Sequence, residues 1–318
     1  MPNNIVLLDA DTLGKVSNMH LLKQFGTLQI FDKTLPNQTI FRVKDADIII
    51  TNKVVIDKTV MDNAPHLKLI CIAATGTNNV DLTYAQKKGI VVKNAAGYST
   101  FSVAQNTFAV LFHLMNHIHW YDNYVKSLNY SNNDLFTHHG PVITELNNKS
   151  YGIIGLGSIG MAVAKIATSF GAKVIYYSTS GKNKNDIYPS VSLKKLLHTC
   201  DIISIHAPLN DSTKSLIGYE QLKQMKNHAI LINMGRGGIV IEKDLARAIN
   251  KGQIGGACLD VYENEPLSTD NQLFEINDRH KLVLTPHIAW ASLESRERLI
   301  EIVAGNIESY LSSTGSLQ

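Results

Sequence analysis

Short apolar runs alternate with amphipathic segments along most of this chain of 318 residues. In roughly the first hundred residues, runs rich in β-branched side chains predict strands at Ile5–Leu8, Asp47–Ile50, Leu69–Ala73 and Ile90–Val92. Segments with helical spacing lie between them, for example Met19–Phe25 and Leu82–Lys88. Strands separated by segments of helix length predict βαβ units and a parallel sheet, so the fold class is α/β.

A second α/β series follows a long helix and an irregular segment. The helical pattern covers Ser99 to Tyr121, and the polar segment from Asn129 to Asn148 has no periodicity. The later strands are predicted at Tyr151–Ile154, Val174–Tyr177, Ile202–Ile205, Ile230–Asn233, Gly256–Asp260 and Leu282–Leu284. The later helices are predicted at Met161–Phe170, Leu193–His198, Tyr219–Met225 and Glu242–Asn250. A last helix runs from Ser292 to about Leu311, and its periodicity does not show on which series it packs.

Composition narrows the class of protein. Hydrophobic residues make up 44% of the chain and charged residues 18%, as in globular proteins with a hydrophobic core. The formal net charge is only +3 without a long basic block, so nucleic-acid binding is not expected as the main role. The first residues do not resemble a signal peptide, and no apolar run is long enough to span a membrane. Cys71, Cys200 and Cys258 are widely separated and are expected to be buried free thiols, which favours the cytoplasm.

The most specific local pattern is a glycine motif between a predicted strand and a predicted helix, Gly155-x-Gly157-x-x-Gly160. Gly155 permits a tight turn, Gly157 lets the backbone approach a pyrophosphate, and Gly160 lets the helix pack closely on the strand. The pyrophosphate would then lie on the free N–H groups of the helix N-terminus. The acidic residue expected after the second strand, which would bind the ribose hydroxyls, is replaced by Ser178.

Polar side chains follow three of the later strands. Arg236 lies among glycines after one strand, and an arginine there can bind a carboxylate at two points. Asp260, Glu263 and Glu265 follow the next strand, and His287 follows the last one. Ligands of parallel α/β sheets bind outside the carboxyl ends of the strands, so these side chains are candidates for chemistry.

These candidates suggest one mechanism. Arg236 would hold the carboxylate of a 2-oxo acid, and protonated His287 would donate a proton to its carbonyl oxygen as a hydride reaches C2. A carboxylate behind His287, most simply Glu265, would orient the ring and favour its charged form. Reduction would need His287 protonated, and oxidation would need it neutral.

Over essentially its full length the chain resembles the D-isomer-specific 2-hydroxyacid dehydrogenases. The motifs that carry the resemblance occur in the family's order: Ala74-Thr-Gly-Thr-Asn-Asn-Val-Asp81, Val103-Ala-Gln105, Gly152 to Gly160, His206-Ala-Pro208, Asn233-Met-Gly-Arg236-Gly, Gly256 to Pro266 and Thr285-Pro-His287. The resemblance implies two Rossmann-like domains with parallel sheets flanked by helices and an active site in the cleft between the domains. It implies a flavodoxin-like substrate-binding domain made of residues 1–98 and 288–318 and a dinucleotide-binding domain made of residues 99–287.

The resemblance also implies roles for individual residues. The family's catalytic arginine, glutamate and histidine fall on Arg236, Glu265 and His287. The backbone of Thr75 and Gly76 would bind the substrate carboxylate together with Arg236. Cofactor-binding positions fall on Gly155, Gly157, Ser158, Ile159, Gly160, Ser178, His206, Pro208, Asn233 and Asp260, with Asp260 beside the nicotinamide amide. The long helix from Ser99 is the family's main dimer contact, so a homodimer is expected.

Within the family the chain is most similar to glycerate dehydrogenases, also called hydroxypyruvate reductases. Such an enzyme interconverts hydroxypyruvate and D-glycerate and often reduces glyoxylate to glycolate; a D-lactate-type enzyme or a broad 2-oxo acid reductase is the alternative. NAD is the expected cofactor, but Ser178 would not repel a 2′-phosphate. Nearby hydroxyls together with Lys182 or Lys184 could bind this phosphate, so we expect relaxed selectivity between NAD and NADP.

Two rival interpretations remain. Some relatives are nucleotide-sensing corepressors, but these carry extensions, whereas this chain ends soon after its last helix. A metal site is conceivable because His113 and His117 are four residues apart on a predicted helix, with His119, His138 and His139 nearby. No acidic ligand pattern accompanies these histidines, so no metal is expected.

Overall fold

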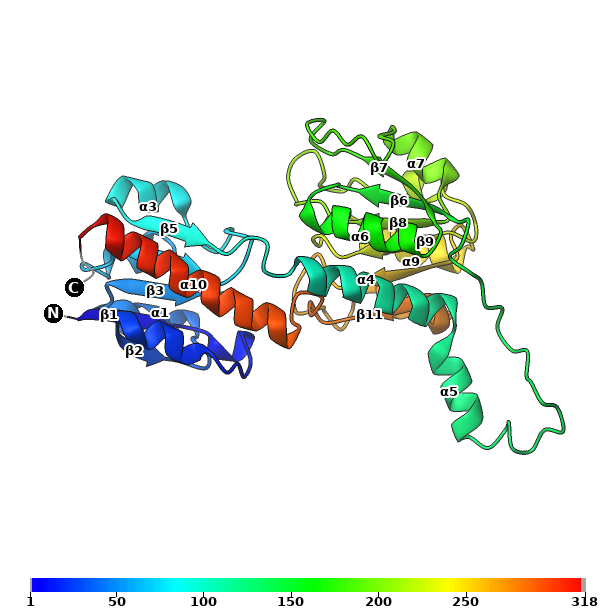
Figure 1. Ribbon diagram of the computed structural model, residues 1–318, viewed down its shortest axis with the longest axis horizontal. Helices are drawn as coiled ribbons and strands as arrows, with labels where there is room; N and C mark the ends of the chain where they lie inside the picture. The colour runs from blue at the N-terminus through cyan, green and yellow to red at the C-terminus, as the bar shows by residue number, and fades with distance from the viewer. Residues whose placement is uncertain (1, 316–318) are drawn as a thin grey trace. The chain divides into compact units, whose positions relative to one another are not determined.

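The structure, a computed structural model, describes residues 2–315 and divides into two compact units. Unit 1 contains the chain up to Ser99 and from Trp290 onward, and unit 2 runs from Thr100 to Ala289. The final helix, α10 (Leu293–Ser313), therefore packs with the first hundred residues. Figure 1 shows this helix in red beside the blue strands of unit 1.

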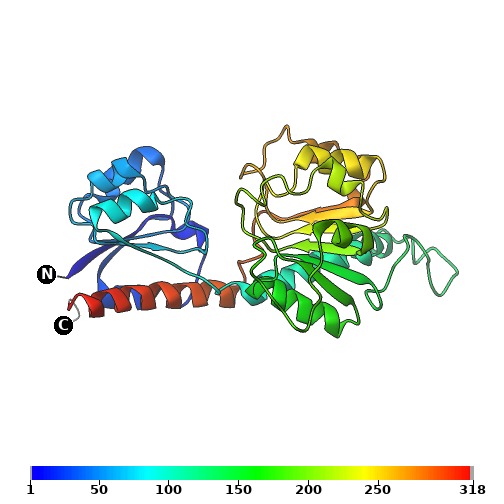
Figure 2. The same ribbon diagram turned by 90° about the horizontal axis from the view of Figure 1, so that it is seen from above.

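Unit 1 is a parallel five-stranded sheet between two layers of helices. The sheet has the order β2-β1-β3-β4-β5, with the bounds β1 Asn3–Leu7, β2 Gly26–Ile30, β3 Ile48–Thr51, β4 Leu69–Ile72 and β5 Val91–Asn94. On one face lie α1 (Pro36–Val43), α2 (Lys58–Asp62) and α3 (Leu82–Lys88). On the other face lie α10 and the 3₁₀ helix η2 (Met19–Phe25), and Figure 2 shows α10 on the opposite side of the sheet from α1 to α3. A further 3₁₀ turn is η1 (Ala10–Thr12).

Unit 2 repeats this plan with a six-stranded parallel sheet. The strand order is β11-β10-β9-β8-β6-β7, with the bounds β6 Ser150–Ile154, β7 Lys173–Tyr177, β8 Ile202–Ile205, β9 Ile230–Asn233, β10 Gly256–Leu259 and β11 Leu282–Leu284. One face is covered by α4 (Thr100–Met115) and α6 (Ser158–Ser169), and the other by α7 (Leu193–Thr199), α8 (Tyr219–Leu222) and α9 (Glu242–Asn250). The 3₁₀ helices η3 (Gln272–Glu275) and η4 (Arg279–Lys281) precede β11.

In both sheets the first strand lies between the second and the third, so the chain reverses its direction of travel across the sheet at that point. A ligand of such a sheet binds beside this switch point, outside the carboxyl ends of the strands. In unit 2 the switch lies between β6 and β8. The glycine motif follows β6 directly, so the fold places that motif where a doubly wound sheet binds its ligand.

Three features differ from the sequence-based expectations. The predicted helix from Ser99 to Tyr121 is in fact two helices, α4 and α5 (Ile118–Lys126). The break falls at His117, which has a left-handed φ of 49°, while the apolar spacing continues through it. The edge strand β2 and the helices α1 and α2 were not predicted, because β2 is half-exposed and has no continuous apolar run. The helix expected at Tyr219–Met225 ends already at Leu222.

The break changes the metal hypothesis as well. Since His117 lies outside both helices, His113 and His117 do not share one helical face. Within residues 2–315, no group of three or more histidine, cysteine or acidic side chains has the arrangement of a metal site.

All three cysteines are buried and free. Among the described residues, no helix combines the length and the apolar character needed to cross a membrane.

Candidate active site

The glycine motif forms a tight connection between β6 and α6. Gly155 has a left-handed φ of 91°, and a Cβ atom on it would lie 3.0 Å from the backbone of Ala207. A Cβ on Gly160 would lie 2.3 Å from the carbonyl oxygen of Gly155, so the first turn of α6 packs directly on the loop. A Cβ on Gly157 would meet nothing within 4 Å. Two of the glycines are therefore required by packing, and the third leaves open space at the helix N-terminus, where an anion can approach the backbone.

Buried polar atoms without a protein partner lie beside this loop. Among residues 2–315, Ser178 Oγ after β7 and His206 Nδ1 after β8 are buried and make no hydrogen bond. The other ring nitrogen of His206, Nε2, lies 3.0 Å from Ser204 Oγ, and burial lowers the pKa of His206 to about 3. The ring is therefore neutral near pH 7. Buried polar groups nearly always have partners, so these two atoms fit a polar ligand bound across the ends of β7, β6 and β8.

The second half of the same sheet edge carries the charged candidates. Arg236 follows β9, Asp260 follows β10 and His287 follows β11, and these three strands are neighbours in the sheet. Because parallel strands end at the same edge, the fold brings together three residues that are separated by more than twenty positions in sequence. The structure places Thr75 and Gly76 in unit 1, after β4. There the Thr75 hydroxyl donates to the carbonyl of Ala95 at 3.0 Å.

His287 is paired with Glu265. The His287 Nδ1 atom lies 2.7 Å from Glu265 Oε2, and the two side chains are 24% and 35% exposed. The other carboxylate oxygen of Glu265 accepts the backbone N–H of Tyr262 at 3.0 Å. This arrangement fixes the imidazole orientation and leaves Nε2 as the ring nitrogen available to a ligand.

The neighbouring Glu263 has a different role. Its carboxylate accepts the backbone N–H of Glu242 at 3.2 Å, and its own N–H donates to the buried Glu242 carboxylate at 2.6 Å. Glu263 thus joins its loop to the start of α9. The structure separates the two glutamates by their partners, which spacing alone did not do.

Asp260 holds the segment that carries His287. It is 1% exposed, and its carboxylate accepts the Thr285 hydroxyl at 2.6 Å and the N–H groups of Ile288 and Ala289 at 2.9 Å each. Burial raises the pKa of Asp260, and these hydrogen bonds oppose the shift. These three hydrogen bonds, which we call the Asp260 clamp, hold the backbone on both sides of His287. The φ of His287 is 54°, a left-handed value that is unfavourable for a residue with a Cβ. The resemblance implies only that Asp260 lies beside the nicotinamide amide. The sequence did not predict its hydrogen bonds to the segment that carries His287.

Close backbone contacts lock the Arg236 turn to the Glu265 loop. A Cβ on Gly237 would lie 1.7 Å from the carbonyl oxygen of Tyr262, so only glycine fits there. The Asn233 side chain accepts from Gly235 N at 3.0 Å and donates to the Arg236 carbonyl at 2.9 Å. The two glycines after Arg236 were the only sign in the sequence of the contact between Gly237 and Tyr262. Tyr262 itself was not identified from the sequence.

The Arg236 side chain is half-buried and makes one hydrogen bond, from Nη1 to the Gly235 carbonyl at 2.8 Å. No carboxylate in the described part of the chain forms an ion pair with it. A guanidinium carries five N–H donors, so most of them remain for an anionic ligand.

Known proteins similar to this chain share one family name or a related activity. The family model described as "D-isomer specific 2-hydroxyacid dehydrogenase, NAD binding domain" matches residues 108–289. A hydroxypyruvate reductase from Blautia hydrogenotrophica is 35% identical, with 91% of each chain covered. A glycerate dehydrogenase from Methylorubrum extorquens is 36% identical, over 98% of this chain and 97% of the relative. The solved structure of an acyclic imino acid reductase in complex with NADPH and D-Arg is 29% identical, with a TM-score of 0.84 over 98% of this chain and 97% of that one.

The glycine geometry predicts different effects on stability for substitutions at two positions of the same loop. In Gly160→Ala the new methyl group would overlap the Gly155 carbonyl, so we expect a loss of about 1–3 kcal/mol. For a unit of this size that loss lowers the melting temperature by roughly 2–10 °C. Gly157→Ala, whose Cβ meets open space, is the matched control and should melt within about 1 °C of the parent protein. Equal losses in the two variants would contradict this account of the loop.

Proposed function

Since the chain belongs to the D-isomer-specific 2-hydroxyacid dehydrogenase family, and is therefore an oxidoreductase with an NAD-binding domain, we propose that it reduces hydroxypyruvate and glyoxylate to D-glycerate and glycolate. The observation that carries the proposal is the 2.7 Å pair between His287 and Glu265, on the sheet edge that also carries Arg236. The names of the relatives support this substrate class.

The dinucleotide is assigned to unit 2. The loop from Gly155 to Gly160, with the backbone of Ser158 and Ile159, would hold the pyrophosphate at the N-terminus of α6. Ser178, His206 and Pro208 would contact the adenosine half. Asn233 would support the nicotinamide half through the turn that it stabilises. When bound, the nicotinamide supplies a hydride to the carbonyl carbon of the substrate.

His287 moves the proton. Its Nδ1 is held by Glu265, so Nε2 donates a proton to the carbonyl oxygen, which becomes the hydroxyl of the product. Glu265 keeps the ring oriented through its contact with Nδ1. In the oxidation direction the same nitrogen accepts the proton from the hydroxy acid.

Arg236 binds the substrate carboxylate through two N–H donors, and the backbone of Thr75 and Gly76 in unit 1 assists it. In this assignment unit 1 is the substrate-binding domain. Asp260 acts through His287, because its carboxylate fixes the backbone on both sides of that residue.

A panel of 2-oxo acids tests the substrate class. Hydroxypyruvate, glyoxylate and pyruvate are each assayed with NADH and with NADPH, and disappearance of the reduced nicotinamide is followed by absorbance. We expect the highest kcat/KM with hydroxypyruvate and a lower value with glyoxylate. A preference for pyruvate would indicate a D-lactate-type enzyme instead, and no turnover with any of the acids would contradict the proposed activity.

Substitutions at the proton-transfer pair test the mechanism. His287→Ala should lower kcat by about 10²–10⁴-fold, because the general acid is lost. Dinucleotide affinity, measured by calorimetry, should stay within about twofold, because the glycine loop is unchanged. Glu265→Gln should lower kcat for reduction by less than His287→Ala does, because an amide holds the ring at Nδ1 less firmly than a carboxylate but leaves the imidazole in place. Near-normal efficiency in His287→Ala would remove His287 from the mechanism.

We also propose that the protein is a homodimer, with α4 and the arm formed by α5 and residues 127–146 at the interface. In Figure 1 this arm projects from the rest of unit 2. Stacked rings join α5 to the segment after it. The ring centroids of Tyr124 and His138 lie 4.1 Å apart, and the Trp120 ring stacks on both. Several of the arm's large apolar side chains are exposed, namely Leu128, Leu135, Phe136, Val142 and Ile143. A group of exposed apolar side chains is typical of an interface.

Light scattering after size exclusion measures the assembly. We expect a dimer for the parent protein, and a monomer or a weakened dimer for Phe136→Asp, whose phenylalanine is 95% exposed. Phe41→Asp in α1, at a side chain that is 73% exposed, is the matched control and should remain a dimer. A monomeric parent protein at tens of micromolar would contradict the proposal.

The three buried free thiols support a reducing compartment, which for this protein we take to be the cytoplasm. The small net charge gives no support for a nucleic-acid partner.

A further inference from the structure

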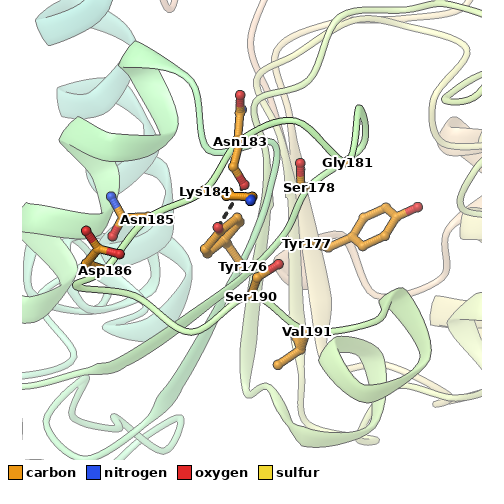
Figure 3. Close-up of a pocket in the computed structure, with 10 residues that line it drawn as sticks. All are labelled: Tyr176, Tyr177, Ser178, Gly181, Asn183, Lys184, Asn185, Asp186, Ser190 and Val191. Carbon is orange, nitrogen blue, oxygen red and sulfur yellow. Dashed lines mark hydrogen bonds between the residues drawn. The ribbon is translucent and has the colours of Figure 1, made fainter.

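We propose that a cavity at the amino-terminal edge of the unit 2 sheet binds a phosphate group, carried by inorganic phosphate or by a small phosphate ester, and that Arg279 and the histidines around it are its ligands. The candidates for catalysis follow the carboxyl ends of the strands, so this site lies at the opposite edge of the sheet. It is also separate from the cavity of about 410 Å³ that Figure 3 shows after β7, where Ser178 lines the space assigned above to the adenosine half.

The cavity lies where the end of α4 and the start of α5 meet the start of β11. Its volume is about 280 Å³, below the roughly 300–1,000 Å³ of pockets for drug-sized ligands. The space therefore suits a compact group rather than a dinucleotide. Its lining consists of His113, His117, His119 and Trp120 from the two helices and their junction, and of Arg279, His280, Leu282 and Val283 from η4 and β11.

The break between α4 and α5 brings the histidines together. In one unbroken helix, His113 and His119 would point roughly 120° apart around the axis. His117 interrupts the helix with its left-handed φ of 49°, a conformation that surrounding contacts must enforce. Beyond it, the His119 ring stacks beside the His113 ring, with centroids 6.3 Å apart and 26° between the planes. Stacked rings do not direct their nitrogens at one point, so this arrangement suits a ligand with several acceptor atoms rather than a metal ion.

The lining of the cavity has one sign of charge. Arg279 is always protonated and carries five N–H donors, and a histidine has at least one N–H even when neutral. No aspartate or glutamate of the described chain lines the cavity. The acids nearest in sequence have other partners, because Asp278 lies 4.0 Å from Lys281 and Asp122 lies 2.7 Å from Lys126. A cleft lined by one sign of charge attracts the opposite ion.

A phosphate group matches this lining in both charge and donors. It carries about −1.5 to −2 charges at pH 7 and three strong acceptor oxygens. Within residues 2–315, Arg279 forms no ion pair, so its planar guanidinium is available to hold two of these oxygens. The imidazole N–H groups then supply donors to the remaining oxygens. A carboxylate, with one charge and two oxygens, uses fewer of these groups.

Trp120 gives the cavity a signal of its own. The chain has two tryptophans, so Trp290→Phe leaves Trp120 as the only one. This variant is titrated with inorganic phosphate, with glycerol 3-phosphate and with acetate at constant ionic strength, and binding is followed by fluorescence and by calorimetry. We expect saturable binding of a phosphate compound at least about tenfold tighter than that of acetate, or about 1.4 kcal/mol. The tighter of the two phosphate compounds identifies the source of the group. No saturable binding of either one would overturn the proposal.

Matched substitutions show whether the response comes from this cavity. Arg279→Ala should weaken phosphate binding at least about tenfold, because it removes the charge-assisted hydrogen bonds. Lys281→Ala removes the same charge from η4 but outside the lining, and should stay within about twofold. His113→Ala should also weaken binding, whereas His139→Ala, outside the lining, should not. Equal effects of the two η4 variants, or binding that is insensitive to Arg279→Ala, would place the phosphate elsewhere and contradict the assignment.

The titration is repeated with Phe136→Asp, because α4 and α5 also belong to the proposed dimer interface. All the donors of the cavity come from one chain, so the affinity for phosphate should change by less than about threefold. Loss of binding in this variant would mean that a partner chain completes the site, and the assignment to one chain would be wrong. None of these measurements depends on turnover, so the site and the proposed activity can fail separately.

Discussion

The carboxylate of Asp260 is the interaction on which the arrangement of the active site depends. It is almost completely buried at the end of β10, and it accepts hydrogen bonds from both sides of His287. A left-handed conformation at a residue other than glycine costs on the order of 1–3 kcal/mol, and surrounding contacts must enforce it. The clamp supplies these contacts, so the histidine is presented to Glu265 in one orientation. Without the clamp, the backbone of His287 would not be held in the conformation that places its Nδ1 atom 2.7 Å from Glu265.

Direct contacts between backbones fix the loops around this clamp. Gly237 touches the Tyr262 carbonyl, and Gly160 touches the Gly155 carbonyl, at distances that leave no room for a Cβ. The first contact joins the turn that carries Arg236 to the loop that carries Glu265, and the second joins α6 to the glycine loop. Backbone contacts of this kind are rigid, because no side chain can rotate to relieve them. The edge of the sheet is therefore organised before a ligand binds, as effective catalysis requires.

Unit 2 divides this edge into two chemical halves. The ends of β10 and β11 carry Asp260, Glu265 and His287, which are bound to one another or to nearby backbone, and the end of β9 carries Arg236, which has no ion pair among the described residues. The ends of β6, β7 and β8 carry open backbone at Gly157 and two buried polar atoms without partners among the described residues, Ser178 Oγ and His206 Nδ1. The first half is suited to proton transfer and substrate binding. The second half lacks hydrogen-bond partners that a dinucleotide would supply.

The sequence by itself determined the α/β class, most of the strands, the glycine motif and the charged residues after β9, β10 and β11. These features depend on local periodicity, on turn chemistry and on short motifs, which a single chain displays directly. It did not show the half-exposed edge strand β2, or the break at His117, where the apolar spacing continues although the helix ends. Tertiary structure alone decided that Glu263 binds the start of α9 at Glu242 and that Asp260 clamps the histidine segment. The physical reason is that the residues of these contacts lie more than twenty positions apart in sequence. Only the packed sheet brings such partners to one edge.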